Sequence, residues 1–167
     1  MVVLPELLAA NERYATQFAK GDLPMPPARK VAVLVCMDAR IDPAKALGLE
    51  EGDAHIIRNA GGRAADALRS LAISQELLGT REVVVIHHTD CGMLTFTNDD
   101  VRQRLTDNVG TAAGAEAAGI DFLPFSDLEQ SVRDDVAMIK SSPLLHDDIS
   151  VSGFIYDIHS GRLSRVD

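Results

Sequence analysis

The chain has 167 residues, 46% of them hydrophobic, and a formal charge of −9 at pH 7. This length suits one domain with a proper hydrophobic core, so we expect residues 1–167 to form a single domain. The acidic balance argues against nucleic acid or an anionic membrane as a partner, because phosphates attract clustered Lys and Arg, and the apolar runs are far shorter than the roughly twenty residues that span a bilayer.

The N-terminal segment predicts an amphipathic helix that ends near Gly21. Its apolar residues recur at helical spacing at Leu4, Leu7, Leu8, Tyr14, Ala15 and Phe18. The proline-rich segment 23–27 cannot continue a helix and is expected to be an extended connector. Residues 1–14 have no basic start and carry Glu6 and Glu12, so they do not resemble a secretory signal, and we expect a cytoplasmic protein.

Strands and helices alternate through the middle of the chain. The continuous, β-branched apolar run at 31–35 predicts a central strand buried on both faces, and further strands are predicted at 54–57 and 83–86. Strands separated by helices imply right-handed crossovers, so we expect an α/β fold with a central, mainly parallel sheet flanked by helices. In such sheets, binding sites collect beyond the carboxyl ends of the strands.

Two helices are predicted between these strands. Asp42-Pro43 indicates an N-cap followed by proline at the first helical position, and this short helix is expected to end near Leu47. A longer helix follows Gly61-Gly62, with one apolar face at Ala64, Ala67, Leu68, Leu71, Ala72 and Leu78. No Gly-x-Gly-x-x-Gly or Gly-Lys-Ser/Thr motif accompanies the glycine pair, so it predicts a tight turn rather than a nucleotide site.

The C-terminal third is expected to complete the sheet. Segment 111–119 consists mostly of small residues and is predicted to be a mobile loop or a frayed helix. Ser126 with Glu129 indicates a capping box before an amphipathic helix. Segments 149–156 and 163–166 predict a final hairpin or an edge pair of strands.

Metal-ligand chemistry lies in two short segments, each at the end of a predicted strand. Residues 36–40 read Cys-Met-Asp-Ala-Arg, and residues 88–91 read His-Thr-Asp-Cys. Two thiolates and an imidazole suit Zn²⁺ better than Mg²⁺ or Ca²⁺, and three firm ligands leave a position for water or a displaceable carboxylate. We therefore predict a catalytic zinc site at the rim of the sheet.

His88 is the predicted ligand of the two neighbouring histidines, because it stands three residues from Cys91 and Gly92 lets the chain turn. His87 then points to the opposite face of the strand and is expected to be a packed or supporting histidine. The alternatives for the two cysteines are buried packing residues or a Cys36–Cys91 disulfide, and the absence of an export signal argues against the disulfide.

This pattern resembles the signature of the β-class carbonic anhydrases, zinc enzymes that hydrate carbon dioxide. The resemblance rests on Cys-x-Asp-x-Arg at 36–40 and His-x-x-Cys at 88–91, extends through Arg-Asn-Ala-Gly-Gly at 58–62, and covers roughly 31–94. The chain is most similar to the short bacterial branch. Ala39 is a departure, since family members more often have Ser at this position.

The resemblance implies one Zn²⁺ per chain on Cys36, His88 and Cys91, with Asp38 as a fourth ligand or as an orienting group. Arg40 is then the partner of Asp38, and its guanidinium offers the carboxylate a bidentate alternative to the metal. The implied catalytic residues are Asp38 and Arg40. Zinc lowers the pKa of bound water toward ~7, so zinc-bound hydroxide is expected to attack carbon dioxide and give bicarbonate and a proton reversibly.

The resemblance also implies an assembly and two alternative functions. In the family, N-terminal helices pack on a partner subunit, so we expect a homodimer or a dimer of dimers. The alternatives are hydrolysis of carbonyl sulfide or carbon disulfide on the same scaffold, and a non-catalytic zinc or thiol sensor in which Asp38 closes the site permanently. Three further histidines are expected to be surface or packed residues: His55, His146 and His159.

Overall fold

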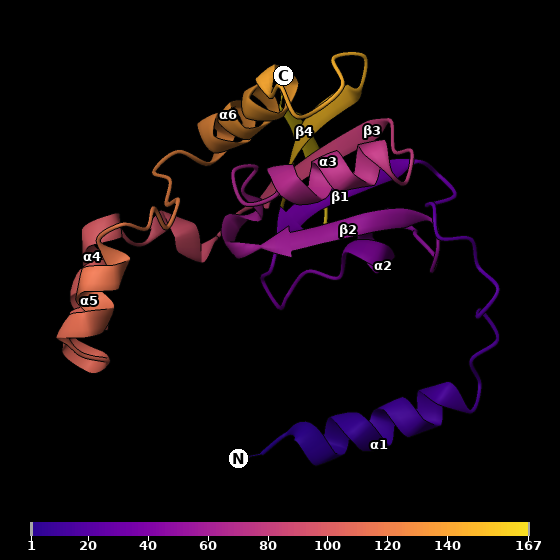
Figure 1. Ribbon diagram of the computed structural model, residues 1–167, viewed down its shortest axis with the longest axis horizontal. Coiled ribbons are helices and arrows are strands. Elements are labelled where there is room, and N and C mark those ends of the chain that lie inside the picture. The colour runs from indigo at the N-terminus through magenta and orange to yellow at the C-terminus, as the bar shows by residue number, and fades with distance from the viewer. Residues whose placement is uncertain (1, 167) are drawn as a thin grey trace.

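The computed structural model describes residues 2–166, so Met1 and Asp167, the ends of the predicted domain, lie outside the described part. At its centre is a five-stranded sheet in the order β2-β1-β3-β4-β5, and the pairs among the first four of these strands are parallel (Figure 1). The strands are β1 (Val31–Cys36), β2 (Ala54–Asn59), β3 (Glu82–His88), β4 (Ser150–Tyr156) and β5 (Leu163–Val166). The mainly parallel sheet confirms the predicted α/β fold.

Helices cover both faces of this sheet. On one face, α3 (Leu68–Glu76) and α6 (Leu128–Ser141) pack on a core that includes Leu34, Leu71 and Ile139. On the other face, α2 (Pro43–Leu47) lies over a second core cluster built on Val33, Val35, Ile41 and Ile86 (Figure 1). The central strands β1 and β3 are therefore buried on both faces, whereas β2 and β5 at the edges of the sheet contain no buried residue.

Local signals explain several element boundaries. The Asp42 side chain accepts a hydrogen bond from the backbone N–H of Lys45, and Gly48 ends α2 in the left-handed conformation, as predicted. The predicted helix after Gly61-Gly62 is shorter than expected: the chain forms the 3₁₀ turn η1 (Ala60–Gly62), continues in a bend and a turn over 64–67, and becomes helical only from Leu68 to Glu76. Antiparallel pairing of β5 with β4 confirms the predicted C-terminal hairpin.

The cap predicted for α6 was wrong by one residue. Asp127, not Ser126, accepts the hydrogen bond from the Gln130 backbone N–H, at 2.9 Å. A carboxylate at the N-cap also favours the positive end of the helix dipole. Ser126 and Glu129 therefore do not form the expected capping box.

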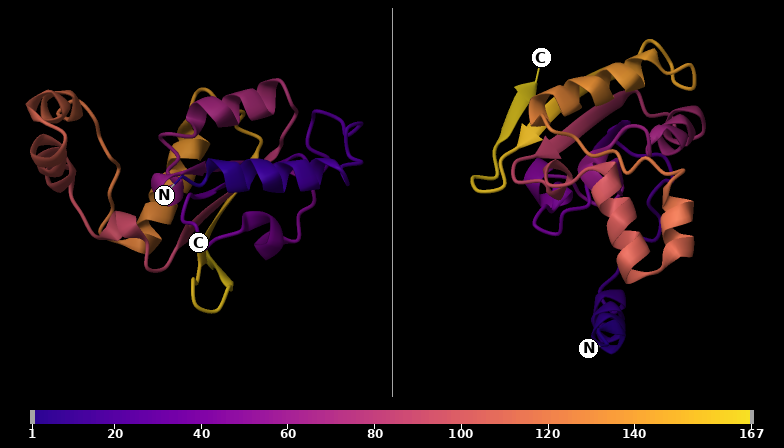
Figure 2. Two further views of the ribbon diagram at one scale, coloured as in Figure 1. Left: turned by 90° about the horizontal axis from the view of Figure 1, so that it is seen from below. Right: turned by 90° about the vertical axis from the view of Figure 1, so that its left-hand side faces the viewer.

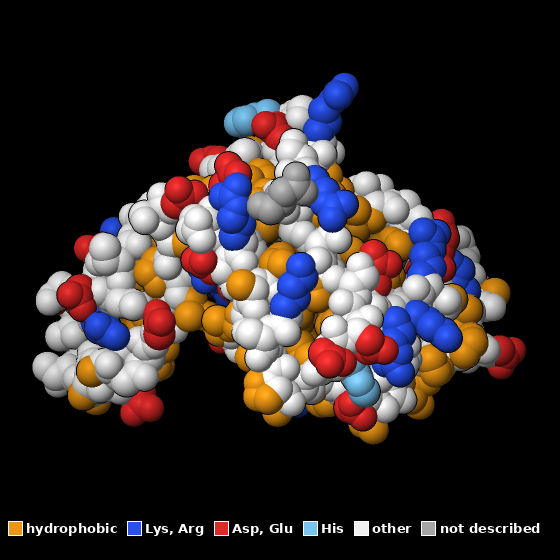
Figure 3. Space-filling model, turned by 90° about the horizontal axis from the view of Figure 1, so that it is seen from above, with side chains coloured by type: hydrophobic (Ala, Val, Ile, Leu, Met, Phe, Trp, Pro, Cys, Tyr) orange, Lys and Arg blue, Asp and Glu red, His pale blue; other side chains and the backbone are white. Residues whose placement is uncertain are grey.

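The segment before α6 contains a pair of helices. Of the two alternatives for 111–119, the structure has a helix, α5 (Thr111–Ala117), which packs on α4 (Asn98–Asn108). The sequence analysis did not predict α4, although Thr97 and Asp100 form a capping box at its start. The space-filling view shows this pair as a lobe separated from the main body by a hollow (Figure 3).

The N-terminal helix α1 (Leu4–Ala15) lies apart from the sheet (Figures 1 and 2). It ends earlier than the predicted boundary near Gly21, and none of its residues is buried. Its large apolar side chains are exposed at Leu4, Leu7, Leu8 and Tyr14. Across residues 2–166, no helix is both long enough and apolar enough to cross a bilayer.

Candidate metal centre

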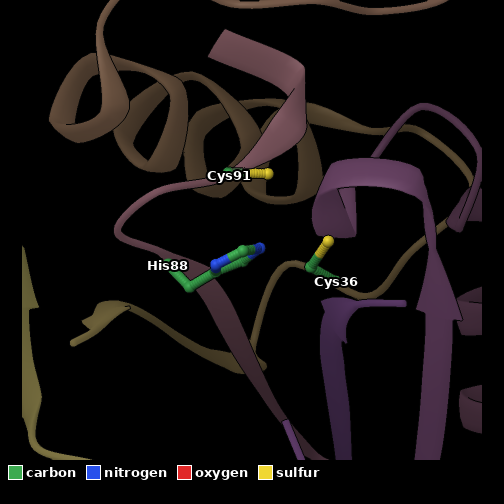
Figure 4. Close-up of side chains that lie close together, drawn as sticks. All are labelled: Cys36, His88 and Cys91. Carbon is green, nitrogen blue, oxygen red and sulfur yellow. The ribbon is translucent and has the colours of Figure 1, made fainter. Parts of the chain in front are cut away.

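Three soft donors converge at one edge of the sheet. Cys36 is the last residue of β1 and His88 is the last residue of β3, and these strands are parallel neighbours. Cys91 follows three residues after His88, directly before the 3₁₀ turn η2 (Gly92–Leu94). The two sulfur atoms and one imidazole nitrogen all lie within 4.8 Å of one another (Figure 4). The fold therefore brings together the three residues that the resemblance implies as ligands.

The cluster is buried and leaves one donor atom unused. His88 is 0% exposed, and its Nδ1 lies 2.8 Å from the carbonyl oxygen of Thr89. Because a carbonyl only accepts, Nδ1 carries the hydrogen and Nε2 keeps a free lone pair. Within the described residues, Nε2 has no hydrogen-bond partner. Metal-bound histidines commonly donate their other ring N–H in this way, so the arrangement fits a soft metal ion such as Zn²⁺.

The charges of the cluster depend on one another. Interaction with the Cys91 thiol lowers the pKa of Cys36 to about 4, against the opposing effect of burial. The same interaction, together with burial, raises the pKa of Cys91. Burial works against a charged His88 ring, but the Cys36 sulfur, the Thr89 carbonyl and the Asp38 carboxylate together raise the pKa of His88. A metal ion that binds two thiolates and a neutral imidazole must displace these protons, so its affinity rises with pH.

Asp38 and Arg40 form a bidentate pair at the mouth of the site. Nε of Arg40 donates to Oδ1 of Asp38 at 2.9 Å, and Nη2 donates to Oδ2 at 2.8 Å. The backbone N–H of Arg40 also donates to Oδ1, at 2.8 Å. Hydrogen bonds from Arg40 hold the pKa of Asp38 well below its usual range. Asp38 therefore remains a carboxylate that is already bound to a guanidinium.

The position of Asp38 bears on its two predicted roles. Its Oδ2 lies 3.9 Å from Nε2 of His88, and the compact donor cluster contains only Cys36, His88 and Cys91 among the described residues. In this arrangement Asp38 faces the cluster but is held outside it by Arg40. Asp38 therefore lies beside the cluster with both carboxylate oxygens bound by Arg40.

Arg58 and Asn59, from the segment 58–62 that extends the family resemblance, brace the backbone of the site. Arg58 donates through Nε and Nη2 to the carbonyl of Cys36, at 3.1 and 3.0 Å, and through Nη2 to the carbonyl of Asp38 at 2.7 Å. Asn59 holds the turn that follows β2 through two hydrogen bonds with the backbone of Arg63. These contacts fix the segment that presents Cys36 and Asp38.

Gly62 brings the η1 turn against the first ligand. Its φ of +69° lies in the left-handed region, and a Cβ at this position would lie 2.9 Å from the backbone N of Cys36. A larger residue would therefore push the turn away from the end of β1. The glycine pair thus serves close packing at the site, in agreement with the predicted tight turn.

An apolar pocket of about 540 Å³ opens beside the cluster. Residues 36–38 and Cys91 from the ligand segments line part of it, and further lining comes from residues that belong to neither segment: Met93, Phe96, Val101 and Phe122. Phe122 and the α4 residue Val101 lie in segments without a motif, so only the folded chain reveals their place. The pocket offers space for a small apolar molecule next to charged and metal-binding groups.

The remaining histidines lie outside the donor cluster. His87 is fully buried, and its ring nitrogens contact Ser131 and Asp135, so it is packed as predicted. His55 contacts Ser74 at 2.7 Å. Like these two, His146 and His159 are not part of the metal-binding cluster found in the described residues.

Comparisons with known proteins identify the family of this chain. A family model for carbonic anhydrase matches residues 31–163. The chain is 44% identical over 167 residues to β-carbonic anhydrase 1 of Mycobacterium tuberculosis. The matched region covers 99% of this chain and 99% of the relative. It is 33% identical to a carbon disulfide hydrolase of Saccharolobus solfataricus, covering 96% of this chain and 87% of the relative. The solved structure of a carbonic anhydrase from Glaciozyma antarctica is 50% identical, covers 100% of both chains and has a TM-score of 0.95.

Proposed function

Because this chain belongs to the β-class carbonic anhydrases, we propose that it catalyses the reversible hydration of carbon dioxide to bicarbonate and a proton at one zinc site per chain. Cys36, His88 and Cys91 hold the ion. The observation that carries the proposal is the buried cluster of two sulfurs and a free imidazole Nε2, with a guanidinium-bound carboxylate beside it. A zinc ion bound there supplies the Lewis acidity that ionises water near neutral pH.

Asp38 orients the attacking oxygen in this proposal. Its Oδ1 accepts two hydrogen bonds from Arg40, whereas Oδ2 accepts one from Arg40 and lies 3.9 Å from Nε2 of His88. A carboxylate oxygen has room for a second donor, so Oδ2 can accept a hydrogen bond from the reacting water. Arg40 meanwhile keeps Asp38 from occupying the metal, and so keeps the site open.

The apolar pocket receives the substrate. Carbon dioxide has no net charge or dipole, so it gains from leaving water for a pocket lined by Met93, Phe96 and Phe122. The product is an anion, which the same lining binds weakly, and this favours its release. The site therefore treats substrate and product differently through solvation alone.

The decisive experiment is stopped-flow carbon dioxide hydration on zinc-loaded protein across pH. We expect the rate to rise with pH, because the reacting water must lose a proton. A rate that is flat from mildly acidic to alkaline pH contradicts the proposal. If Arg40→Ala keeps its activity, Arg40 does not act as the gate that holds Asp38 away from the metal. If the protein binds zinc but hydrates no carbon dioxide, the sensor function is favoured instead.

A second candidate activity is hydrolysis of carbonyl sulfide or carbon disulfide. The observation in its favour is the apolar lining of the pocket, which suits linear sulfur analogues as well as carbon dioxide. Several relatives of this chain carry the name carbon disulfide hydrolase. We expect kcat/KM for carbon dioxide to exceed that for carbonyl sulfide in the same preparation. A higher kcat/KM for carbonyl sulfide would make its hydrolysis the main activity.

The proposed assembly is a homodimer or a dimer of dimers in which α1 packs on a partner subunit. Support comes from the exposed apolar side chains of Leu4, Leu7 and Leu8 on a helix that buries none of its residues. Introducing Leu7→Glu with Leu8→Glu is expected to yield monomers in sedimentation, while the polar-face change Arg13→Ala leaves the assembly intact. A wild-type monomer at micromolar concentration that is fully active contradicts this assembly.

Residues 1–167 act as a single catalytic domain in this proposal, and we place the protein in the cytoplasm. The support for the location is chemical, because the two buried cysteines are free thiols that zinc requires in reduced form. Mass spectrometry of intact protein after alkylation under denaturing conditions tests this state. Two alkyl groups are expected, and none would indicate a disulfide.

A further inference from the structure

We propose that Asp90 is a positioning residue that holds the Arg40 guanidinium in the orientation from which it retains Asp38. This inference rests on the proposed function, and it assigns a role to a residue that lies between two predicted ligands without being one of them. Asp90 reaches Arg40 from across the site, since the two residues are fifty positions apart in the chain. The contact therefore links the segment that follows β1 to the segment that follows β3.

The two aspartates bind different parts of the same guanidinium. Asp38 accepts from Nε and Nη2 of Arg40. Asp90 accepts from Nη1 through its Oδ2, at 2.7 Å, and from Nη2 through its backbone carbonyl, at 3.0 Å. Because the two sets use mostly separate N–H groups, they reinforce one another instead of competing. The guanidinium is thus fixed on two sides.

Arg40 needs this second support because it is exposed. Its side chain is 47% accessible to solvent, and a long side chain in that position pays rotamer entropy to stay in one geometry. Asp38, which stands two residues before Arg40 in the chain, binds the guanidinium only through Nε and Nη2. Asp90 adds a contact from a segment fixed to another strand, so the guanidinium stays in place if Asp38 moves.

The backbone at Asp90 is shaped for this contact. Its φ is +54°, in the left-handed region, which only two other non-glycine residues in 2–166 share. Aspartate tolerates this conformation better than most residues. The preceding residue is anchored to the end of the sheet, because Thr89 donates its N–H to the carbonyl of Tyr156 at 3.0 Å and accepts from the Ile158 N–H at 2.9 Å.

The contact between Asp90 and Arg40 sets an equilibrium between two arrangements of Asp38, one bound to Arg40 and one released toward the metal. With Asp90 present, Arg40 keeps Asp38 as its partner and the metal position stays open to water. Without the Asp90 carboxylate, the guanidinium turns toward solvent for part of the time, and Asp38 is released toward the metal. Loss of Asp90 therefore closes a fraction of the sites without removing any ligand.

Two variants separate the carboxylate from the backbone. Asp90→Gly keeps the left-handed conformation at no steric cost and removes the carboxylate, and Asp90→Asn keeps one neutral acceptor. The matched control is Asp99→Asn, which removes a carboxylate from another arginine, Arg102, in an exposed pair on α4. We expect kcat/KM for carbon dioxide to fall about tenfold in Asp90→Gly and about threefold in Asp90→Asn, with less than a twofold change in the control.

A second readout distinguishes positioning from a structural effect. We expect zinc content to remain at one ion per chain, and the d–d spectrum of cobalt(II)-substituted Asp90→Gly to shift toward that of Arg40→Ala. Full activity of Asp90→Gly overturns the inference, and so does a loss of zinc that parallels the loss of activity. Wild-type protein that hydrates no carbon dioxide instead refutes the proposed function, which is a separate result.

Discussion

Two adjacent histidines on β3 lie in equally buried but chemically opposite surroundings. His87 and His88 are both 0% exposed. The ring of His88 keeps a free Nε2 that faces two cysteine sulfurs. The ring of His87 has both nitrogens engaged, by the Ser131 hydroxyl at 2.8 Å and by Oδ2 of Asp135 at 3.0 Å. The hydrogen-bond partners of the ring nitrogens, and not the burial of the ring, therefore distinguish a metal donor from a packed histidine.

The His87 side of the sheet is a structural polar cluster. Because a carboxylate only accepts, Nε2 of His87 carries a hydrogen and donates to Asp135. The same carboxylate oxygen lies 3.0 Å from Nε of Arg63. Arg63 and His87 both pack on the Phe125 ring, with the His87 centroid 5.4 Å away. This cluster ties α6 and the segment before it to the strand that carries the metal site.

The largest expected effect comes from removing the free imidazole. In His88→Ala we expect the zinc content to fall close to zero and carbon dioxide hydration to fall roughly a thousandfold, because the ion loses its only nitrogen ligand. Elemental analysis and stopped-flow kinetics measure both. Full zinc occupancy in this variant would show that the metal is held elsewhere.

Changing the gate is expected to cost less than removing a ligand. Arg40→Ala should retain one zinc per chain but lose about a hundredfold in kcat/KM, because Asp38 is then free to occupy the metal. Zinc analysis separates this outcome from loss of the ion. Lys at position 40 is the matched variant, and it should recover only part of the activity because an ammonium cannot make the bidentate contact.

On the opposite side of β3, substitution should affect stability and not the metal. In His87→Gln we expect zinc content and kcat/KM to stay within twofold of the wild type, while the free energy of unfolding falls by about 2 kcal/mol because Asp135 loses a buried partner. Urea unfolding measures the loss. His55→Gln, at a half-buried histidine, is the control and should cost less. Loss of zinc in His87→Gln would erase the contrast between the two histidines.

The smallest expected effect concerns pH. Arg40 depresses the pKa of Asp38, so the pair contributes stability above the unfolded pKa of about 3.9 and loses it as the pH falls through the lower folded value. The difference in urea midpoint between wild type and Asp38→Asn should therefore be constant from pH 7 to 5 and shrink only in stronger acid. The difference is expected to be small, since Arg40 is exposed. A difference that vanishes already at pH 6 contradicts the pairing.

Much of the fold follows from local patterns in the sequence. Continuous apolar runs indicate β1 and β3, a shorter apolar pair indicates β2, and the Asp42 cap with Gly48 marks α2. The α4 helix was missed because its apolar positions are few, and the α6 cap was misplaced because Ser126 and Asp127 are neighbouring residues of similar capping ability. Short-range rules predict that an element exists better than where it begins.

The candidate site divides in the same way. The ligand types and their spacing are properties of the sequence, since Cys36, His88 and Cys91 stand where strands end and carry the donor atoms that zinc prefers. The apolar wall formed by Phe96, Val101 and Phe122, and the support of Arg40 by Asp90, come from segments far apart in the chain. No local pattern encodes such contacts, because they depend on how whole elements pack.

The sequence by itself thus determined the kind of metal, the residues able to bind it and the parallel sheet that presents them. Only the tertiary structure decided which donor atom of His88 is free and that Asp90 holds Arg40 from across the site. It also decided that His87 is fully engaged with α6. The physical reason is that chemical identity is carried by single residues, whereas the availability of a lone pair depends on every neighbour that the fold places around it.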